Sequence, residues 1–230
     1  TVIPGDPNAS NQDVLDVRLD FSRRLAASED KCYTTVSGDR EETGRLRIGY
    51  VSSFFGSESD MKPVWELIRT HDRNHFEIYL FADNAIDELK WFEPSSGDRV
   101  HVTKSLSNRS IVELIRSQEI DVLVDLNAFS VPLRLPIYTH RLARVVAAWF
   151  NMYATSGLPG IDWIIGDHFV IPESEEKFYS EKVARLRQCY LSFDVKYDAP
   201  PIGPLPCRQN GFFIFGTFGL VVFLMLFVQT

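Results

Sequence analysis

Three short polar segments each follow an apolar run, and their side chains could bind a polar ligand. They are residues 52–58, 127–130 and 151–157, with Ser, Asn, Thr and Glu among their side chains. Hydroxyls and amides can hydrogen-bond a sugar or a phosphate, although in turns they also bond to the neighbouring backbone. The candidate substrate-binding residues are Ser53, Asn127, Ser130, Thr155, Ser156 and Gly157.

Glu58 is the only carboxylate in these three segments. It stands just before a predicted helix, where the helix dipole favours a negative charge. A carboxylate so placed can accept a proton in general base catalysis, although the dipole weakens it as a base. We therefore take Glu58 as the candidate catalytic residue, with a solvated surface glutamate as the alternative.

These segments must be positioned by strands and helices that alternate along the chain. Short apolar runs typical of buried parallel strands occupy residues 46–51, 76–82, 99–103, 121–126, 145–150 and 161–166. Helices are expected at residues 60–70, 88–92, 107–118, 135–141 and 173–180, and residues 185–193 are irregular or a strand. Such alternation predicts an α/β fold, a Rossmann-like three-layer lobe. Ligands bind such sheets at the carboxyl ends of the strands, so the three polar segments are expected on one rim.

The two ends of the chain differ in composition from this central part. Residues 13–27 predict a helix with Asp13 as N-cap, and a charged linker follows. Residues 198–206 are rich in proline and read as a linker between domains. The expected division is therefore an N-terminal helix and linker at 1–44, a lobe at 45–197, and a linker with the start of a further segment at 198–230.

Residues 211–228 carry one polar side chain, Thr217, in an otherwise apolar stretch. This length would suffice for a membrane-spanning helix. The glycines in the stretch also suit a buried strand running into a turn. The composition leaves both alternatives open, and membrane association is expected only through this segment.

The composition limits the classes of partner. The formal net charge of −7 argues against a nucleic-acid surface, which needs an excess of Lys and Arg. The three cysteines are far apart and show no Cys/His spacing typical of zinc, so no metal site is expected. Sparse cysteines favour a reducing compartment, and a cytoplasmic location is expected.

Several segments, taken in order, resemble one family over about residues 45–218. They read RLRIGYVSS at 45–53, HDRNHFEIYLF at 71–81, DVLVDL at 121–126, TSGLPGIDWIIGD at 155–167 and NGF-x-x-FGTF at 210–218. This ordered set resembles the catalytic region of the protein O-linked N-acetylglucosamine transferases, the SPINDLY-like glycosyltransferases. The resemblance implies the N-terminal half of a GT-B fold. It also implies inverting transfer of GlcNAc from UDP-GlcNAc to Ser/Thr hydroxyls, with a nucleotide sugar and an acceptor protein as partners and no cofactor.

The chain departs from the family pattern at positions that matter for chemistry. Phe54 and Glu58 stand where the family has Asp and His, and Phe129 stands where it has His or Tyr. Residues 219–230 do not continue the family pattern, and in the family most UDP contacts come from a second lobe. The resemblance therefore implies a glycosyltransferase that is divergent and truncated. The alternative is a catalytically inactive lobe that acts as a protein-binding module, or a non-functional fragment.

Overall fold

The computed structural model describes residues 8–28, 44–57, 61–85, 89, 93–191, 198 and 200–212. The chain divides into two compact units, Thr1–Asp194 and Val195–Thr230. The helices, including 3-10 helices marked η, are α1 (Asn11–Ser28), α2 (Lys62–Thr70), α3 (Asn108–Ser117), η2 (Ala128–Ser130), η3 (Pro132–Thr139), η4 (Glu173–Phe178) and α4 (Pro206–Asn210). The strands are β1 (Leu46–Ser52), β2 (Phe76–Ala82), β3 (Arg99–Val102), β4 (Val122–Asp125), β5 (Val145–Ala148), β6 (Trp163–Asp167) and β7 (Lys182–Leu186).

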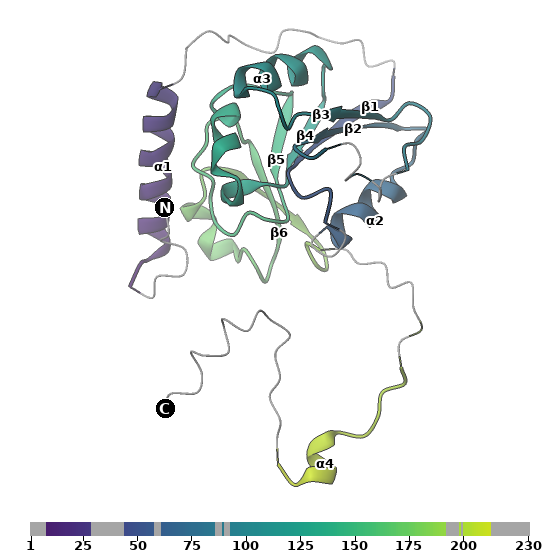
Figure 1. The fold of residues 1–230 in the computed structure, drawn as a ribbon. Helices are drawn as coiled ribbons and strands as arrows, with labels where there is room; N and C mark the ends of the chain where they lie inside the picture. Colours follow the sequence, from purple (N-terminus) through teal and green to yellow (C-terminus); the bar gives the residue numbers. More distant parts are fainter. Residues whose placement is uncertain are drawn as a thin grey trace. The chain divides into compact units, whose positions relative to one another are not determined.

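The strands of the first unit form one parallel sheet (Figure 1). Its order is β3-β2-β1-β4-β5-β6-β7, so the chain moves outward from β1 in one direction and then from β4 in the other. This reversal makes the pair β1 and β4 the topological switch point of a doubly wound sheet. Ligands of such folds bind at the carboxyl ends of the strands beside that point.

Two apolar clusters cover the two faces of this sheet. Tyr50 and Val51 are neighbours in β1 but belong to different clusters, because successive side chains of a strand point to opposite faces. The Tyr50 cluster includes Trp65 of α2, and the Val51 cluster includes Ile115 of α3. In Figure 1, α2 accordingly lies on one side of the sheet, and α3 and α1 lie on the other side. The predicted three-layer Rossmann-like lobe is confirmed.

Local sequence signals account for the start of two helices. Ser107 caps α3, since its Oγ accepts the Ser110 N–H at 3.1 Å. The prediction for α1 was wrong by one turn. Ser10 is the capping residue, since its Oγ accepts the Asp13 N–H at 3.2 Å while Asp13 Oδ2 accepts the Ser10 N–H at 2.8 Å. This reciprocal pair is a capping box, in which Asp13 occupies the third helical position.

Two other expectations need correction. The helix expected at residues 135–141 is a 3-10 helix that begins earlier, at Pro132. Pro136 lies inside it, and a proline lacks the N–H that an α-helix needs there. Residues 185–193 were expected to be irregular or a strand. Residues 185 and 186 end β7, Lys182–Leu186, and residues 187–191 are irregular, because pairing with β6 rather than local composition decides where the strand lies.

Some expectations lie partly or wholly outside the described residues. Glu58, most of the short helix expected at residues 88–92, and residues 213–228 belong to this group. Within the described part of the chain, no helix is both long and apolar enough to cross a membrane. Before this apolar segment the chain forms the helical turn α4, which Gly211 ends with φ of 76°.

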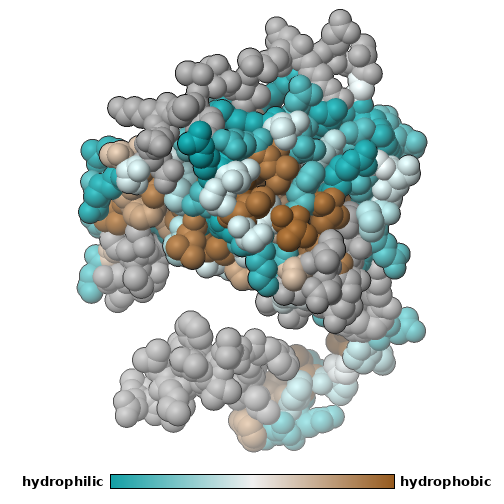
Figure 2. All heavy atoms as spheres, turned by 45° about the horizontal axis from the view of Figure 1, so that its top comes forward, coloured by the Kyte–Doolittle hydropathy of each residue, from teal (hydrophilic) through white to brown (hydrophobic). Residues whose placement is uncertain are grey.

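Apolar side chains also reach the surface of the lobe. Leu133 is 82% exposed and Phe169 is 86% exposed. Figure 2 shows hydrophobic side chains gathered in the middle of one face, surrounded by hydrophilic ones. Folded proteins commonly leave much apolar surface in water, so single exposed residues of this kind need no special role.

Candidate functional site

The carboxyl ends of β1 and β4 are joined by a side-chain hydrogen bond at the switch point. Ser53 follows β1, and its N–H donates to Oδ1 of Asn127, which follows β4, at 2.7 Å. Asn127 is almost fully buried, at 1% exposure. Two of the predicted substrate-binding residues therefore lie together at the rim where this fold class binds ligands.

Asp125 shapes the turn that carries Asn127. Its carboxylate accepts the N–H groups of Asn127 at 3.1 Å and Ala128 at 3.0 Å, and the Tyr138 hydroxyl at 2.8 Å. Burial raises the pKa of Asp125, and these hydrogen bonds only partly oppose the rise. Ala128 has φ of 45°, a left-handed conformation that costs a non-glycine residue energy. Asp125 thus stabilises a strained turn.

Asn151, from the third polar segment, completes this group. Its Nδ2 donates to the Asn127 carbonyl oxygen at 3.2 Å and to the Ser130 Oγ at 2.9 Å. Nδ2 of Asn127 is buried and has no hydrogen-bond partner among the described residues. We call Ser53, Asp125, Asn127, Ser130 and Asn151 the rim cluster.

A half-buried ion pair between Arg134 and Asp83 supports the rim cluster from the side of β2. Ser53 Oγ donates to Asp83 Oδ2 at 3.2 Å. Arg134 of η3 binds the same carboxylate with two nitrogens, at 2.6 and 3.0 Å. Arg134 also donates to the Leu106 carbonyl oxygen at 3.0 Å. Two-point binding fixes the direction of both side chains, so the loop after β1 is held against the segment after β3.

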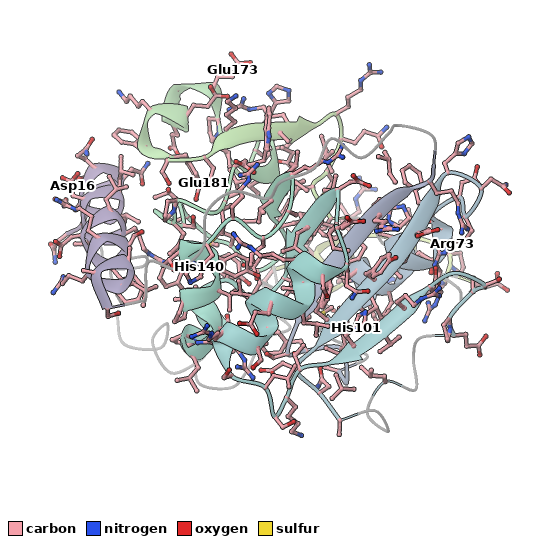
Figure 3. The ribbon with its side chains drawn as sticks, turned by 90° about the horizontal axis from the view of Figure 1, so that it is seen from above. Asp16, Arg73, His101, His140, Glu173 and Glu181 are labelled. Carbon is pink, nitrogen blue, oxygen red and sulfur yellow. The ribbon has the colours of Figure 1, made fainter. Side chains whose placement is uncertain are left out.

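Thr155 and Ser156 belong to a second group, built around Glu181 just ahead of β7. Glu181 accepts the Thr155 hydroxyl at 2.8 Å, the Ser156 N–H at 2.7 Å and the Ser156 hydroxyl. Ser180 N–H donates to the Thr155 Oγ1 at 3.0 Å. Figure 3 shows Glu181 on the side of the lobe that faces α1, the helix that carries Asp16. We call Thr155, Ser156, Ser180 and Glu181 the crossover cluster, since residues 155 and 156 lie between β5 and β6.

Gly157 continues the crossover with φ of 68°, in the left-handed region that glycine tolerates. The structure thus divides the six predicted substrate-binding residues into two groups. Ser53, Asn127 and Ser130 lie in the rim cluster, while Thr155 and Ser156 lie in the crossover cluster next to Gly157. Substrate binding by any of them stays a prediction, as does the catalytic role of Glu58.

Sequence reasoning missed several members of these groups. Asn151 was visible inside a segment already selected for its polar residues. Asp83 follows the end of β2, so the rule that ligands meet the ends of parallel strands could have selected it. Glu181 offered no local signal, because its partners are 25 and 26 residues away in sequence.

Several known proteins are similar in sequence to this lobe. The sequence pattern described as "Glycosyl transferase family 41" matches residues 23–199. In Arabidopsis thaliana, "Probable UDP-N-acetylglucosamine--peptide N-acetylglucosaminyltransferase SEC" is 30% identical over 154 residues, 66% of this chain and 16% of that protein. The protein of the same description named SPINDLY, from the same plant, is 25% identical over 191 residues, covering 81% of this chain and 21% of the relative.

A solved structure is similar to this chain as well. It is a mutant O-GlcNAc transferase from Thermobaculum terrenum, with a TM-score of 0.71 and 27% identity. The likeness covers 81% of this chain and 36% of that one. The chain thus spans about a fifth or less of these two plant relatives and about a third of the bacterial enzyme.

Proposed function

The chain belongs to glycosyl transferase family 41, and we propose that it forms the N-terminal lobe of an enzyme that moves GlcNAc from UDP-GlcNAc to Ser/Thr hydroxyls of proteins. The names of its relatives describe a UDP-N-acetylglucosamine–peptide transferase and an O-GlcNAc transferase. The chain covers a minor part of their length, so donor, acceptor and activity are all part of this proposal.

One observation carries the proposal. The family match coincides with a polar cluster at the switch point of the sheet, where Asn127 joins the loops after β1 and β4. Asn127 brings an unpaired amide N–H group to this place, among the described residues. A sugar presents many hydroxyls, and the Ser130 hydroxyl and the Asn151 amide beside Asn127 can exchange hydrogen bonds with them.

The proposed reaction places one demand on the acceptor side. The acceptor oxygen forms a bond to the anomeric carbon while the bond from that carbon to the UDP oxygen breaks. The acceptor proton must pass to a base. We assign that base to Glu58, which lies outside the described residues. Asp125 is unsuited because it is 1% exposed and its oxygens are engaged within the turn.

We further propose that the transfer needs no metal ion or other cofactor, and that the protein works in the cytoplasm. The family resemblance supports the first statement and the sparse cysteines support the second. Transfer that is unchanged by a chelator, and recovery from the cytosolic fraction of cells, are the expected results. Loss of transfer on chelation would contradict the first, and recovery from membranes the second.

The test is a transfer assay with radiolabelled UDP-GlcNAc and acceptor peptides, together with calorimetry of UDP binding. We expect label on Ser/Thr peptides, abolished in Glu58→Gln and reduced in Asn127→Ala. Failure to bind UDP even at millimolar concentration would contradict the enzymatic proposal for this chain.

The second candidate is a lobe that binds peptides without catalysis. It is favoured by Phe129, which stands at a His/Tyr position of the family and is packed against Phe21 of α1, with ring centroids 5.9 Å apart. A phenyl ring can neither give nor accept a proton. Peptide binding without UDP binding in the same calorimetric experiment would support this candidate.

A further inference from the structure

Arg18 is a buried cation on an otherwise largely solvent-facing helix. It lies in the middle of α1 and is 6% exposed, whereas Arg23 and Arg24 of the same helix are exposed. Burying a guanidinium is costly unless other groups compensate for lost water. Such a residue is expected to do something that an apolar side chain would not.

The guanidinium of Arg18 stacks on the rim-cluster loop. Its Cζ lies 3.2 Å from the centroid of the Phe129 ring, within the range of a cation–π contact. Phe129 is the central residue of η2, between Ala128 with its left-handed backbone and the rim residue Ser130. Arg18 therefore contacts the same strained turn that Asp125 holds by its hydrogen bonds.

The same residue meets the crossover. A Cβ added to Gly157 would lie 2.7 Å from the Arg18 carbonyl carbon and 2.8 Å from its oxygen, so the helix backbone lies directly on this glycine. Burial lowers the pKa of Arg18 to about 10, and the negative charge of Glu181 acts in the opposite direction. The side chain thus stays charged at neutral pH and is attracted by the crossover cluster.

We propose that Arg18 is a positioning residue that couples the crossover cluster to the rim cluster, by stacking on Phe129 while its backbone seats on Gly157. The proposal depends on the proposed function in one respect only, namely that the rim cluster is the place where the sugar binds. The coupling itself is a property of the folded chain and can be measured without donor.

Arg18 and Phe21 precede residue 23, where the family match begins. The α1 helix nevertheless packs on the lobe through Phe21 and Leu25, which join the apolar cluster of Val51. The alternative to our proposal is that these apolar contacts suffice, and that Arg18 contributes nothing specific. Removing a buried charge changes the free energy of unfolding through desolvation and lost charge interactions whether or not Arg18 couples the two loops, so stability alone cannot distinguish the two.

The test is hydrogen exchange, followed by mass spectrometry, of the full chain without donor. The variants are Arg18→Met, Arg18→Lys, and Arg24→Met as the matched exposed control on α1. In Arg18→Met we expect exchange at least tenfold faster in peptides covering residues 127–131 and 153–158. Peptides covering residues 62–70, in α2 on the other face of the sheet, should be unchanged. Arg18→Lys keeps the cation and should restore most of the protection, while Arg24→Met should resemble the parent chain.

Three results would overturn the proposal: unchanged exchange in Arg18→Met, faster exchange in only one of the two loops, or an equal increase throughout the lobe. UDP-GlcNAc binding measured on the same variants separates the two proposals. Loop exchange that responds to Arg18 while no variant binds donor supports the coupling and contradicts the function. If the parent chain binds donor but loop exchange is unchanged in the Arg18 variants, the proposed function is supported and the coupling is contradicted.

Discussion

The rim cluster and the crossover cluster both contain residues that the sequence nominated for substrate binding, but their surroundings differ. In the rim cluster, Ser130 is exposed and the Asn127 amide keeps an N–H group without a partner among the described residues. In the crossover cluster, Thr155 and Ser156 are at most 1% exposed and their hydroxyls are engaged by Glu181. The rim cluster thus retains hydrogen-bonding capacity for a ligand, whereas the crossover cluster uses its capacity to join segments of the lobe.

The largest effect on the free energy of unfolding is expected where Gly157 meets α1. In Gly157→Ala, the new Cβ would collide with the Arg18 backbone, and alanine would also have to adopt φ of 68°. We expect a loss of about 3 kcal/mol in the free energy of unfolding, from overpacking and backbone strain together. Urea denaturation measures it. Gly203→Ala is the control, since a Cβ there meets nothing within 4 Å, and equal losses in both variants would contradict the close approach.

A smaller effect on the free energy of unfolding is expected from Glu181→Gln. The amide keeps the shape of the side chain but replaces one acceptor with a donor and removes the charge that faces Arg18. We expect a loss of about 2 kcal/mol, because buried partners are left unsatisfied. Thermal and urea unfolding measure the change. Glu173→Gln, at an exposed position of η4, should leave stability unaltered. If Glu181→Gln proved equally harmless, the crossover cluster would not be structural.

Asn127→Ala tests the rim cluster in the same way. The substitution leaves the Ser53 N–H without its acceptor, and we expect a loss of about 1 kcal/mol in the free energy of unfolding. Ser130→Ala, which removes only an exposed acceptor of Asn151, should cost less. A larger loss from Ser130→Ala than from Asn127→Ala would show that the rim is organised around a different residue.

The smallest effect is expected in the pH dependence of stability. Burial raises the pKa of Asp125 above its ordinary value of 3.8, so the folded chain holds this proton to higher pH than the unfolded chain. As pH rises from 3.8 to the folded pKa, the parent chain should lose stability relative to Asp125→Asn, and the difference should then stay constant. Urea denaturation of both proteins across the acid range measures this difference. A difference that grows with pH in favour of the parent chain would mean that the pKa is lowered instead.

Much of the lobe could be predicted from the sequence because its signals are local. Apolar runs predicted six of the seven strands of the sheet, and a helix was predicted at residues 107–118, where α3 lies. The rim cluster was predicted in part, because parallel strands place the residues that follow them at one edge. Ser53 and Asn127 could therefore be expected to meet, although 74 residues separate them.

The crossover cluster could not be predicted in this way. A Thr-Ser-Gly segment is equally suited to bind a ligand, to cap its own turn or to seat a helix, and its composition does not distinguish these roles. Its partner Glu181 stands beside β7, whose start is decided by pairing with β6. The role of Arg18 was hidden for a similar reason, since its partners Phe129 and Gly157 lie far from α1 in the sequence.

The sequence by itself determined the class of fold, the order of its elements and the family, because periodicity and motif order are properties of neighbouring residues. The tertiary structure alone decided which polar residues face one another, which of them stay available, and that α1 rests on Gly157 through Arg18. These contacts join segments distant along the chain, and their geometry depends on how helices and strands pack rather than on any single segment.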